Sequence, residues 1–519
     1  MIILKKHPFF SFSIKLFFCI ALTVFQFNIL FAQKQKNELD AIIKEWASPD
    51  DFPDHVILSA TKDPSTSIGI NWRTKSSNKV GYVEIAVAGD GPNFRKKKIR
   101  QYAKRSLVNS EKATIDGFES SFFEVKIEGL KPKTLYAYRV GNTKFKSEWH
   151  QFTTASDKES PISFLYVGDA QNYILELWSR VIRNAFKEAP NADFFIHAGD
   201  LVNLAHDESE WNEWFAAGSF IHSQIPSIAV PGNHEYQGAD KNQPRAGREL
   251  SIQWESQFSF PKNGPKGLEE TCYYIDYPNL KVIALNSNVK IKLQANWLKK
   301  VLATNNKKWT VVTYHHPVFS ASTGRDNAEL RKYWKPLFDE YNVDLALQGH
   351  DHTYARGAVY KNPNQLERDG KSKIVKGPVY VVSVSGGKMY SLSKQGWDEF
   401  GAKKEKAGEQ MVNYMRWVCH WRGLGTHMNP GEELPKTDHK LDLLSYEFLH
   451  ERNMLFGTVD YIINKIEEME SELNLQNLKV WSNFPGVKHE DCMKSIQLFT
   501  EKIIPHFKSK EKSTIKAAS

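Results

Sequence analysis

The chain is poor in cysteine, with only four among its 519 residues. Cys19 lies in an apolar stretch near the beginning, and the other three, Cys272, Cys419 and Cys492, are far apart in the sequence. Three widely spaced cysteines form neither a disulfide scaffold nor a close-spaced metal motif. We therefore expect them to pack as small apolar groups, with at most one disulfide among them.

The chain also lacks a strong excess of charge, a fixed-period repeat and a low-complexity tract. Its formal net charge of +9 is mild for this length and gives no nucleic-acid-binding signature. Apolar residues make up 41% and charged residues 25%, which excludes wholesale disorder, collagen and a multi-span membrane protein. The length predicts roughly two to four domains.

A single apolar run, residues 16–32, follows the basic residues Lys5, Lys6 and Lys15. This pattern is typical of a signal peptide, predicted at residues 1–32 with cleavage before Gln33. The alternative is an uncleaved anchor helix, but the run is interrupted by polar residues and is shorter than the roughly 20 residues that span a bilayer. We expect an exported protein, periplasmic or extracellular, with no stable membrane insertion after cleavage.

Residues 51–155 form the first predicted domain, an all-β sandwich. Short β-rich runs alternate there with polar turns. The run from Leu130 to Tyr138 has a Leu-x-Pro turn before alternating tyrosines, which matches a tyrosine corner and resembles fibronectin type III domains. Trp72 is a predicted core residue. Such sandwiches are usually scaffolds or spacers, and glycan binding is the alternative.

Residues 160–410 are predicted to form an α/β layered domain, because strand-like runs now alternate with amphipathic helical ones. Helices are expected at residues 174–189 and 293–303, and a strand at residues 379–387 is followed by a helix-like stretch to about residue 410. The predicted architecture is therefore multidomain: the β-sandwich, this α/β sandwich and a small α/β C-terminal segment, residues 411–519.

Five predicted strands each run into a Gly- or Pro-containing turn with a metal-competent side chain. The strands are expected at residues 162–167, 194–198, 228–230, 310–314 and 345–348, and the side chains that follow are Asp169, Asp200, Asn233 with His234, His315, and His350 with His352. Ligands of α/β sheets bind beyond the carboxyl ends of the strands, so these turns can meet in one crevice. His197 and His316 are interpreted as core histidines.

Carboxylate, amide and imidazole donors together favour Fe, Zn or Mn over calcium. Two such ions bridged by one carboxylate would suit in-line displacement at phosphorus by a hydroxide held between them. Any one of these turns alone is more often structural, but all five in this order indicate a metal centre.

The five turns resemble those of the calcineurin-like metallophosphoesterases, and most closely the purple acid phosphatase branch. The run Gly349–Tyr354 is similar to that branch's last motif, and the branch also has a fibronectin-like sandwich ahead of its catalytic domain. The resemblance implies two metal ions with Asp200 between them. It gives the other ligands as Asp169 and His352 on the first metal, and Asn233, His315 and His350 on the second. It implies that His234 faces the substrate, as a catalytic residue together with Asp200.

The chain departs from the branch at two positions. Asn203 stands where the purple enzymes have a metal-bound tyrosine, so we predict a colourless protein without an obligatory ferric site. Gln171 stands where the wider superfamily often has a histidine. The amide of Gln171 or of Asn203 is either a weaker fourth ligand of the first metal or a hydrogen-bond partner of its ligands. Arg325 is a candidate phosphate clamp, since its planar fork suits a phosphoryl group.

The last hundred or so residues change character. Helices are predicted at residues 460–473 and 492–507, with a short strand at residues 478–481. The segment resembles the end of luciferase-like flavin monooxygenases, although the preceding barrel of that family is missing. A recombined gene end, a docking module and an ordinary helical subdomain remain open.

The sequence therefore predicts an exported, dinuclear-metal phosphoric ester hydrolase that acts on small phosphate esters, monoesters first and diesters second. One alternative is a flavin-dependent oxidoreductase, which only the tail supports. The other is a surface glycan-binding protein whose metal site is degenerate because of Gln171 and Asn203. If the tail is a joining error, the chain would instead fold poorly.

Overall fold

The computed structural model describes residues 45–108, 119–236, 249–359, 377–390, 392, 393, 397, 402–408, 458–473 and 489–508. The chain divides into two compact units, residues 1–414 and 415–519. No helix among the described residues has the length and hydropathy that crossing a bilayer requires. The predicted signal peptide lies outside these residues.

The first part of unit 1 is a β-sandwich. Its strands are β1 (Asp54–Ser59), β2 (Ile68–Lys75), β3 (Tyr82–Val87), β4 (Ile99–Tyr102), β5 (Lys104–Val108), β6 (Ser120–Ile127), β7 (Leu135–Gly141) and β8 (His150–Thr153). Trp72 is buried and stacks on Phe123, with ring centroids 5.2 Å apart. The tyrosine corner is confirmed, because the Lys131 N–H donates to the Tyr136 hydroxyl over 2.8 Å.

The sandwich and the α/β domain share a sheet. Its seven strands run in the order β5-β6-β2-β1-β11-β10-β9, and the last three, β9 (Phe164–Val167), β10 (Phe194–His197) and β11 (Ser227–Ala229), belong to the α/β region. The junction is the parallel pair β1 and β11, where the Ala60 N–H donates to the Ser227 carbonyl over 2.9 Å. The sandwich is therefore continuous with the α/β region.

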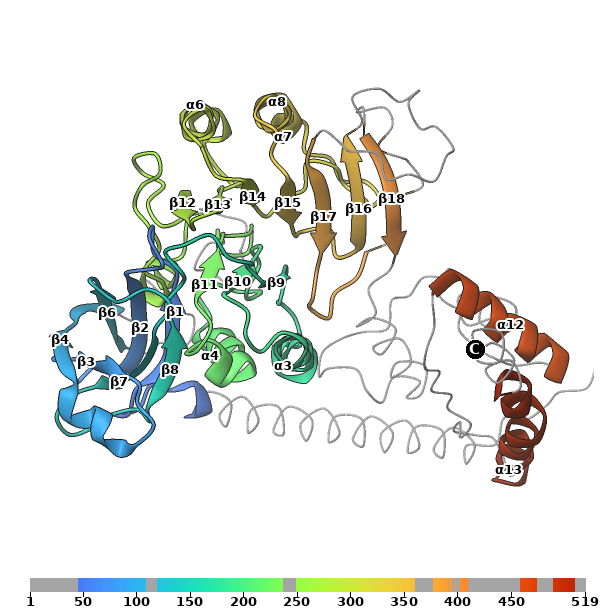
Figure 1. Ribbon diagram of the computed structural model, residues 1–519, viewed down its shortest axis with the longest axis horizontal. Helices are drawn as coiled ribbons and strands as arrows, with labels where there is room; N and C mark the ends of the chain where they lie inside the picture. The colour runs from blue at the N-terminus through green and yellow to red at the C-terminus, as the bar shows by residue number, and fades with distance from the viewer. Residues whose placement is uncertain are drawn as a thin grey trace, which may run out of the picture. The chain divides into compact units, whose positions relative to one another are not determined.

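A second seven-stranded sheet has the order β12-β13-β14-β15-β17-β16-β18. Its strands are β12 (Tyr273–Asp276), β13 (Leu280–Ala284), β14 (Trp309–Thr313), β15 (Leu345–Gln348), β16 (Tyr354–Val359), β17 (Val379–Ser383) and β18 (Ala402–Gly408). Helices α6 (Ile291–Ala303), α7 (Ala328–Tyr333) and α8 (Lys335–Glu340) cover its outer face, whereas α3 (Ser179–Glu188) and α4 (Glu208–Gly218) lie beyond the first sheet (Figure 1). The two sheets enclose a shared apolar core.

Two predicted helical stretches differ in the structure. The one at residues 174–189 begins with a π-helical turn, Ile174–Trp178, before α3. The helix-like interpretation of the stretch to residue 410 is wrong over residues 402–408, which form strand β18, antiparallel to β16. The polar sequence of β18 has no β-branched residue, so the exposed edge of β16 decides its conformation rather than its own propensity.

The second unit is described only in part. It contains α12 (Val459–Leu473) and α13 (His489–Leu498), followed by a π-helical turn, Phe499–Ile503. The helix predicted at residues 460–473 is confirmed, and the strand predicted at residues 478–481 lies outside the described residues. Cys272 is buried and has a free thiol, as expected, and Cys419 also lies outside the described residues.

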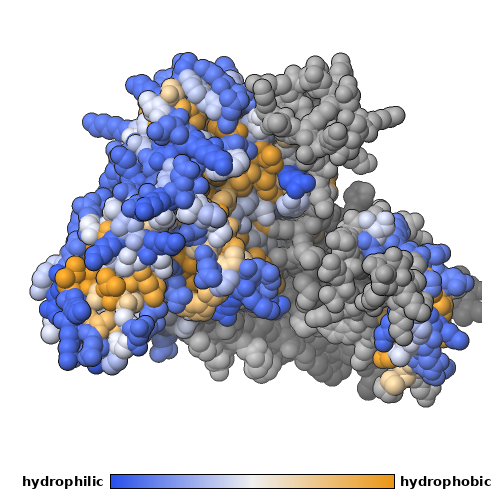
Figure 2. Space-filling view, viewed as in Figure 1, coloured by the Kyte–Doolittle hydropathy of each residue, from blue (hydrophilic) through white to orange (hydrophobic). Residues whose placement is uncertain are grey.

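The second sheet of the sandwich, with the strand order β4-β3-β7-β8, carries exposed apolar side chains. Ile99 and Tyr102 of β4 are 60% and 65% exposed, and Val87 of β3 is 48% exposed. Figure 2 shows an apolar patch over this region, on a face that is otherwise largely hydrophilic where the structure is described.

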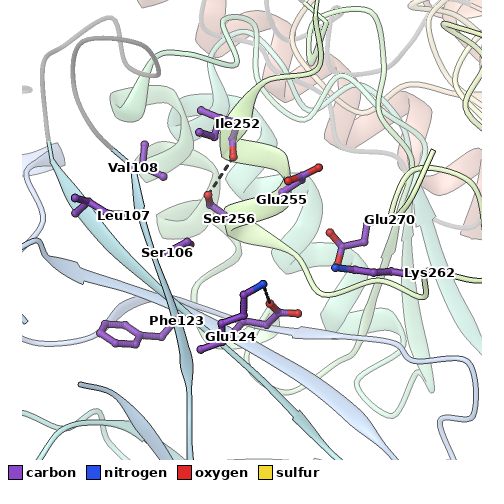
Figure 3. A pocket seen from close by; sticks show the side chains of 11 residues that line it. Ser106, Leu107, Val108, Phe123, Glu124, Ile252, Glu255, Ser256, Lys262 and Glu270 are labelled. Atoms are coloured by element: carbon purple, nitrogen blue, oxygen red, sulfur yellow. Dashed lines mark hydrogen bonds and ion pairs between the residues drawn. The ribbon is translucent and has the colours of Figure 1, made fainter. Parts of the chain in front are cut away.

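A pocket of about 200 Å³ lies where strands β5 and β6 meet helix α5 (Ile252–Gln257) (Figure 3). None of the predicted metal ligands is among its lining residues. Glu270 and Lys262 line it, with Nζ of Lys262 3.4 Å from Oε1 of Glu270. Burial raises the pKa of Glu270 from 4.5 to about 7; Lys262 opposes this rise, and Glu124 and Glu255 add to it. The folded protein therefore keeps a proton on Glu270 that the unfolded chain releases at lower pH.

The free energy of unfolding should consequently fall as the pH rises from about 4.5 to 7. Glu270→Gln cannot ionise, so we expect it to be about 3 kcal/mol more stable than the wild type at pH 8 and equally stable at pH 4. Urea unfolding of both proteins at the two pH values measures this difference. A difference that does not change with pH would contradict the assignment.

Candidate metal centre

The five predicted turns meet at one edge of the two sheets. Strands β9, β10 and β11 are parallel to one another, as are β13, β14, β15 and β17, so their carboxyl ends lie together within each sheet. The sheets join at this edge, where the Gly168 N–H donates to the Ser383 carbonyl over 2.9 Å and the Ser385 N–H donates to the Gly168 carbonyl over 2.8 Å. The side chains that follow both sets of strands are therefore brought together.

Four of the predicted ligands have left-handed backbone conformations, which non-glycine residues rarely adopt. Their φ angles are 43° at Asp169, 51° at Asp200, 73° at His350 and 46° at His352. Such residues cost about 1–3 kcal/mol each and are concentrated at functional sites. Close approach also demands glycine, because a Cβ on Gly232 would lie 2.1 Å from Oδ1 of Asp200.

One group of donors surrounds Asp169. Nε2 of His352 lies 3.3 Å from Oδ2 of Asp169. The side-chain amide of Gln171 lies between His352 and Asp200, with its Nε2 3.2 Å from Nε2 of His352 and 3.0 Å from Oδ2 of Asp200. All four side chains are buried. Asp169, Asp200 and His352 are the predicted first-metal set, and in this orientation the Gln171 amide nitrogen is a hydrogen-bond partner of Asp200 and His352.

A second group of donors surrounds Nε2 of His315. This atom is 3.2 Å from Oδ2 of Asp200, 3.2 Å from Oδ1 of Asn233 and 3.1 Å from Nδ1 of His350. Asp200 thus faces both groups. His316 also belongs here, since its ring centroid is 4.2 Å from that of His350 and a ligand atom from each of His315, His316 and His350 lies within 4.8 Å of the others.

The interpretation of His316 as a core histidine is therefore wrong, whereas that of His197 is confirmed. His316 is half-buried at the centre, and its Nδ1 and backbone N–H both contact the Ser287 hydroxyl at 2.9 Å. His197 is 1% exposed and packs against Phe195 and Trp214. The two residues differ in direction: the His316 ring points into the crevice, and the His197 ring points into the core.

The buried charges of the centre interact strongly. Burial alone would lower the pKa of His315, but Asp200 and Asp169 raise it to about 9. Burial raises the pKa of Asp169, whereas His315 and His234 hold that of Asp200 well below its usual value against the effect of burial. Burial lowers the pKa of His352 to about 3. Without a metal, the centre is therefore organised around an Asp200–His315 ion pair.

The ligands are oriented by a surrounding set of hydrogen bonds. The backbone carbonyl of Ala198 contacts Nδ1 of His315 at 2.8 Å, and that of Lys388 contacts Nδ1 of His352 at 3.1 Å. Because a carbonyl only accepts, each Nδ1 carries the proton and each Nε2 is turned to the centre. This arrangement is typical of metal-binding histidines.

Sequence reasoning missed Glu235, which fixes the two turns on either side of Asp200. Its carboxylate is fully buried and accepts from the backbone N–H groups of Asp200 (2.9 Å), Leu201 (2.9 Å) and Gly232 (2.6 Å). Its position directly after Asn233 and His234 was the available signal, but nothing in the sequence shows that it points away from the crevice.

His234 lies at the mouth of the centre. Its Nε2 is 3.9 Å from Oδ2 of Asp200, and its Nδ1 is 2.6 Å from the backbone carbonyl of Asn203. Burial lowers its pKa. The described contacts of Asn203 come from its backbone, which supports His234.

Arg325 lies beside the same mouth. Its Nη1 donates to the His350 carbonyl over 3.0 Å, and its guanidinium lies 4.4 Å from the centroid of the Tyr390 ring. Nζ of Lys388 lies 5.5 Å from the same ring. Arg325 and Lys388 also contribute to lowering the pKa of His352. A half-buried pair of cations therefore borders the acidic centre.

The donors fit the metal ions that the five turns predict. Oδ2 of Asp169, which faces His352 across the centre, is buried and accepts no hydrogen bond, a costly state that a cation would relieve. The donors are carboxylate oxygen, amide oxygen and imidazole nitrogen, which suit Fe, Zn or Mn. Metal binding must displace the proton of His315, so it should release protons.

Comparisons with known proteins agree with this geometry. Residues 162–354 match the calcineurin-like phosphoesterase family, and residues 53–154 match the purple acid phosphatase N-terminal domain. The chain is 25% identical over 392 residues to purple acid phosphatase 15 of Arabidopsis thaliana, covering 67% of this chain and 71% of that protein. It is also 25% identical over 291 residues to the probable inactive purple acid phosphatase 9 of the same plant, covering 47% and 44%.

Among solved structures, a purple acid phosphatase from yellow lupin (Lupinus luteus) seeds aligns with a TM-score of 0.55 at 18% identity, covering 66% of this chain and 67% of that one. This likeness supports the fold. The matches together confirm the resemblance that the five turns and the tyrosine corner indicated.

Proposed function

Because this chain joins a purple acid phosphatase N-terminal domain to a calcineurin-like phosphoesterase domain, it is a metal-dependent phosphoester hydrolase, and we propose that it is an exported enzyme that cleaves small phosphomonoesters at a dinuclear centre. The observation that carries this proposal is the position of Asp200, whose Oδ2 faces both donor groups. Export rests on the apolar run at residues 16–32 and its basic start.

We assign the first metal to Asp169, Asp200 and His352, with Gln171 as a hydrogen-bond partner of these ligands, and the second to Asp200, Asn233, His315 and His350. When bound, two such cations neutralise the ester's negative charge and lower the pKa of water, which makes hydroxide available near neutral pH. Asp200 holds both groups in one frame. The buried backbone network around Glu235 keeps this frame rigid.

The half-buried residues at the mouth bind and orient the ester. Arg325 retains N–H donors beyond the one used for the His350 carbonyl, and a guanidinium suits two phosphoryl oxygens at once. His234 presents Nε2 to the space above Asp200 and can give a proton to the departing alkoxide. The positive charge of Arg325 and Lys388 favours a monoester dianion over a diester monoanion, which supports monoesters as the first substrate class.

The test is hydrolysis of p-nitrophenyl phosphate and of bis(p-nitrophenyl) phosphate by the purified protein, stripped of metal and reloaded with Zn, Mn or Fe. We expect metal-dependent turnover, faster with the monoester. No turnover with any metal, in a protein shown to be folded, would favour the binding-protein alternative with a degenerate centre.

A further inference from the structure

A carboxyl group of helix α4 is joined to His234 through a single peptide group. Glu210, in the first turn of α4, uses one oxygen, Oε2, to accept hydrogen bonds from the backbone N–H groups of Asn203 and Leu204, the second at 2.8 Å. The Asn203 carbonyl in turn contacts Nδ1 of His234 at 2.6 Å. This carbonyl and the Leu204 N–H belong to the same amide, so Glu210 and His234 bind its two ends.

We propose that Glu210 is a positioning residue for His234, acting through the Asn203–Leu204 peptide to fix which ring nitrogen faces the substrate. The proposal rests on the phosphoesterase function proposed above. A hydrogen bond accepted from the N–H end of an amide polarises it and strengthens its carbonyl as an acceptor. The Asn203 carbonyl therefore binds Nδ1–H more firmly than an unsupported carbonyl of a loop would.

The tautomer of His234 follows from this contact. A carbonyl oxygen only accepts, so Nδ1 carries a proton in both protonation states of the ring. The proton that the ring gains or loses is consequently the one on Nε2, the atom that faces Asp200. In the reaction, hydroxide forms a new bond to phosphorus while the bond between phosphorus and the ester oxygen breaks, the Nε2 proton passes to that oxygen, and the ring becomes neutral. No proton crosses the peptide.

Glu210 is not required as a cap of its own helix. Asp207 already occupies the N-cap of α4 and accepts the Ser209 N–H over 2.9 Å. The Glu210 side chain reaches instead to N–H groups that precede the helix. Burial raises the pKa of Glu210 to about 8, but only Oε2 takes part, so the contact persists when the other oxygen is protonated.

The kinetic test compares Glu210→Ala and Glu210→Gln with Glu213→Ala, a half-buried carboxyl on the same helix outside this chain of hydrogen bonds. A p-nitrophenolate leaving group needs no proton, whereas the alkoxide from glycerol 2-phosphate does. We expect Glu210→Ala to lower kcat about tenfold with glycerol 2-phosphate and less than threefold with p-nitrophenyl phosphate. A tenfold fall is typical when a residue that orients a functional side chain is removed. Glu210→Gln should restore most of the loss, and Glu213→Ala should match the wild type.

Two kinetic results would overturn the proposal. One is an equal loss with both esters, which is what a general disturbance of the fold produces. The other is additivity: if the losses of Glu210→Ala and His234→Ala add in the double variant, the two residues act independently.

A second readout does not depend on turnover. In protein labelled with ¹⁵N-histidine, the Nδ1–H resonance of His234, assigned by its disappearance in His234→Ala, should be sharp in the wild type and in Glu213→Ala. It should be broadened by solvent exchange in Glu210→Ala, and an unchanged resonance there would refute the link. If the wild type hydrolyses neither ester, the proposed function fails, and the resonance still decides whether Glu210 positions the ring.

Discussion

Asp200→Asn should abolish most of the activity of this protein, with a fall in kcat of roughly 10³-fold or more, because the substitution removes the only carboxylate that faces both described donor groups. Asparagine has the same size as aspartate, and its Oδ1 can still accept a hydrogen bond from the backbone N–H of His234, whose nitrogen lies 2.9 Å from Oδ1 of Asp200. The fold should therefore survive. The substitution removes the negative charge of the side chain. The second metal depends on this charge most, because its other assigned donors are neutral amide and imidazole groups.

Metal content and thermal stability test this expectation alongside the rate. A ligand that binds only the folded state raises the melting temperature, and the rise grows with its affinity. We expect Zn or Mn to raise the melting temperature of the wild type and to have little effect on Asp200→Asn, which should also retain less metal after dialysis. Asp193→Asn is a matched control, because Asp193 directly precedes the same strand, β10, at the end opposite to the centre. Wild-type metal content and rate in Asp200→Asn would refute the bridging assignment.

The turns of the metal centre were predictable because they depend on local sequence and on a general property of sheets. A buried strand followed by Gly-Asp, or by Gly-Asn-His, defines both the end of the strand and the donor. Parallel strands then bring the donors to one edge. Asp169 and Asp200 follow neighbouring parallel strands, so their convergence needed no knowledge of distant contacts.

The direction of a side chain was not predictable in the same way. His315 and His316 are adjacent, yet both lie at the centre, because the chain has left strand β14 and no longer alternates sides at this point. Glu235 was missed because the backbone N–H groups of Asp200 and Leu201 come near it only in the folded chain. The partners of Glu210 are close in sequence, but they are backbone N–H groups, which leave no residue pattern to read. The β1–β11 junction was missed since a single residue pair defines its register.

The second large effect that we expect concerns the joint between the sandwich and the α/β domain. Arg73 of β2 is fully buried and forms ion pairs with Asp54 of β1 and Glu208 of α4. It also donates to the Ala47 carbonyl over 3.1 Å and to Oδ1 of Asn212 over 3.3 Å. The side chain of Glu208 is 0% exposed, so without Arg73 its charge would be buried with no cation beside it.

Arg73→Met should therefore lower the free energy of unfolding by about 3–5 kcal/mol, the usual cost of breaking a buried ion pair from one side. Arg73→Met combined with Glu208→Gln should recover part of this loss, because the uncompensated charge is then removed. Arg105→Met is the control on the same sheet: Arg105 is only partly buried and bonds Ser121 and Ser76, so its loss should cost less than about 1 kcal/mol. Urea unfolding followed by circular dichroism measures all three variants.

The same variants show whether the sandwich is a spacer or part of the enzyme. If it were a spacer, Arg73→Met would loosen it without changing the catalytic rate, and the α/β region would unfold separately. The shared sheet and the ion pair from β2 to α4 predict the opposite, because α4 also carries Glu210, whose Oε2 binds the turn that supports His234. We expect the sandwich and the α/β region to unfold in one transition, and a lower kcat in Arg73→Met at temperatures where it is still folded. Two transitions, with the rate unchanged, would restore the spacer interpretation.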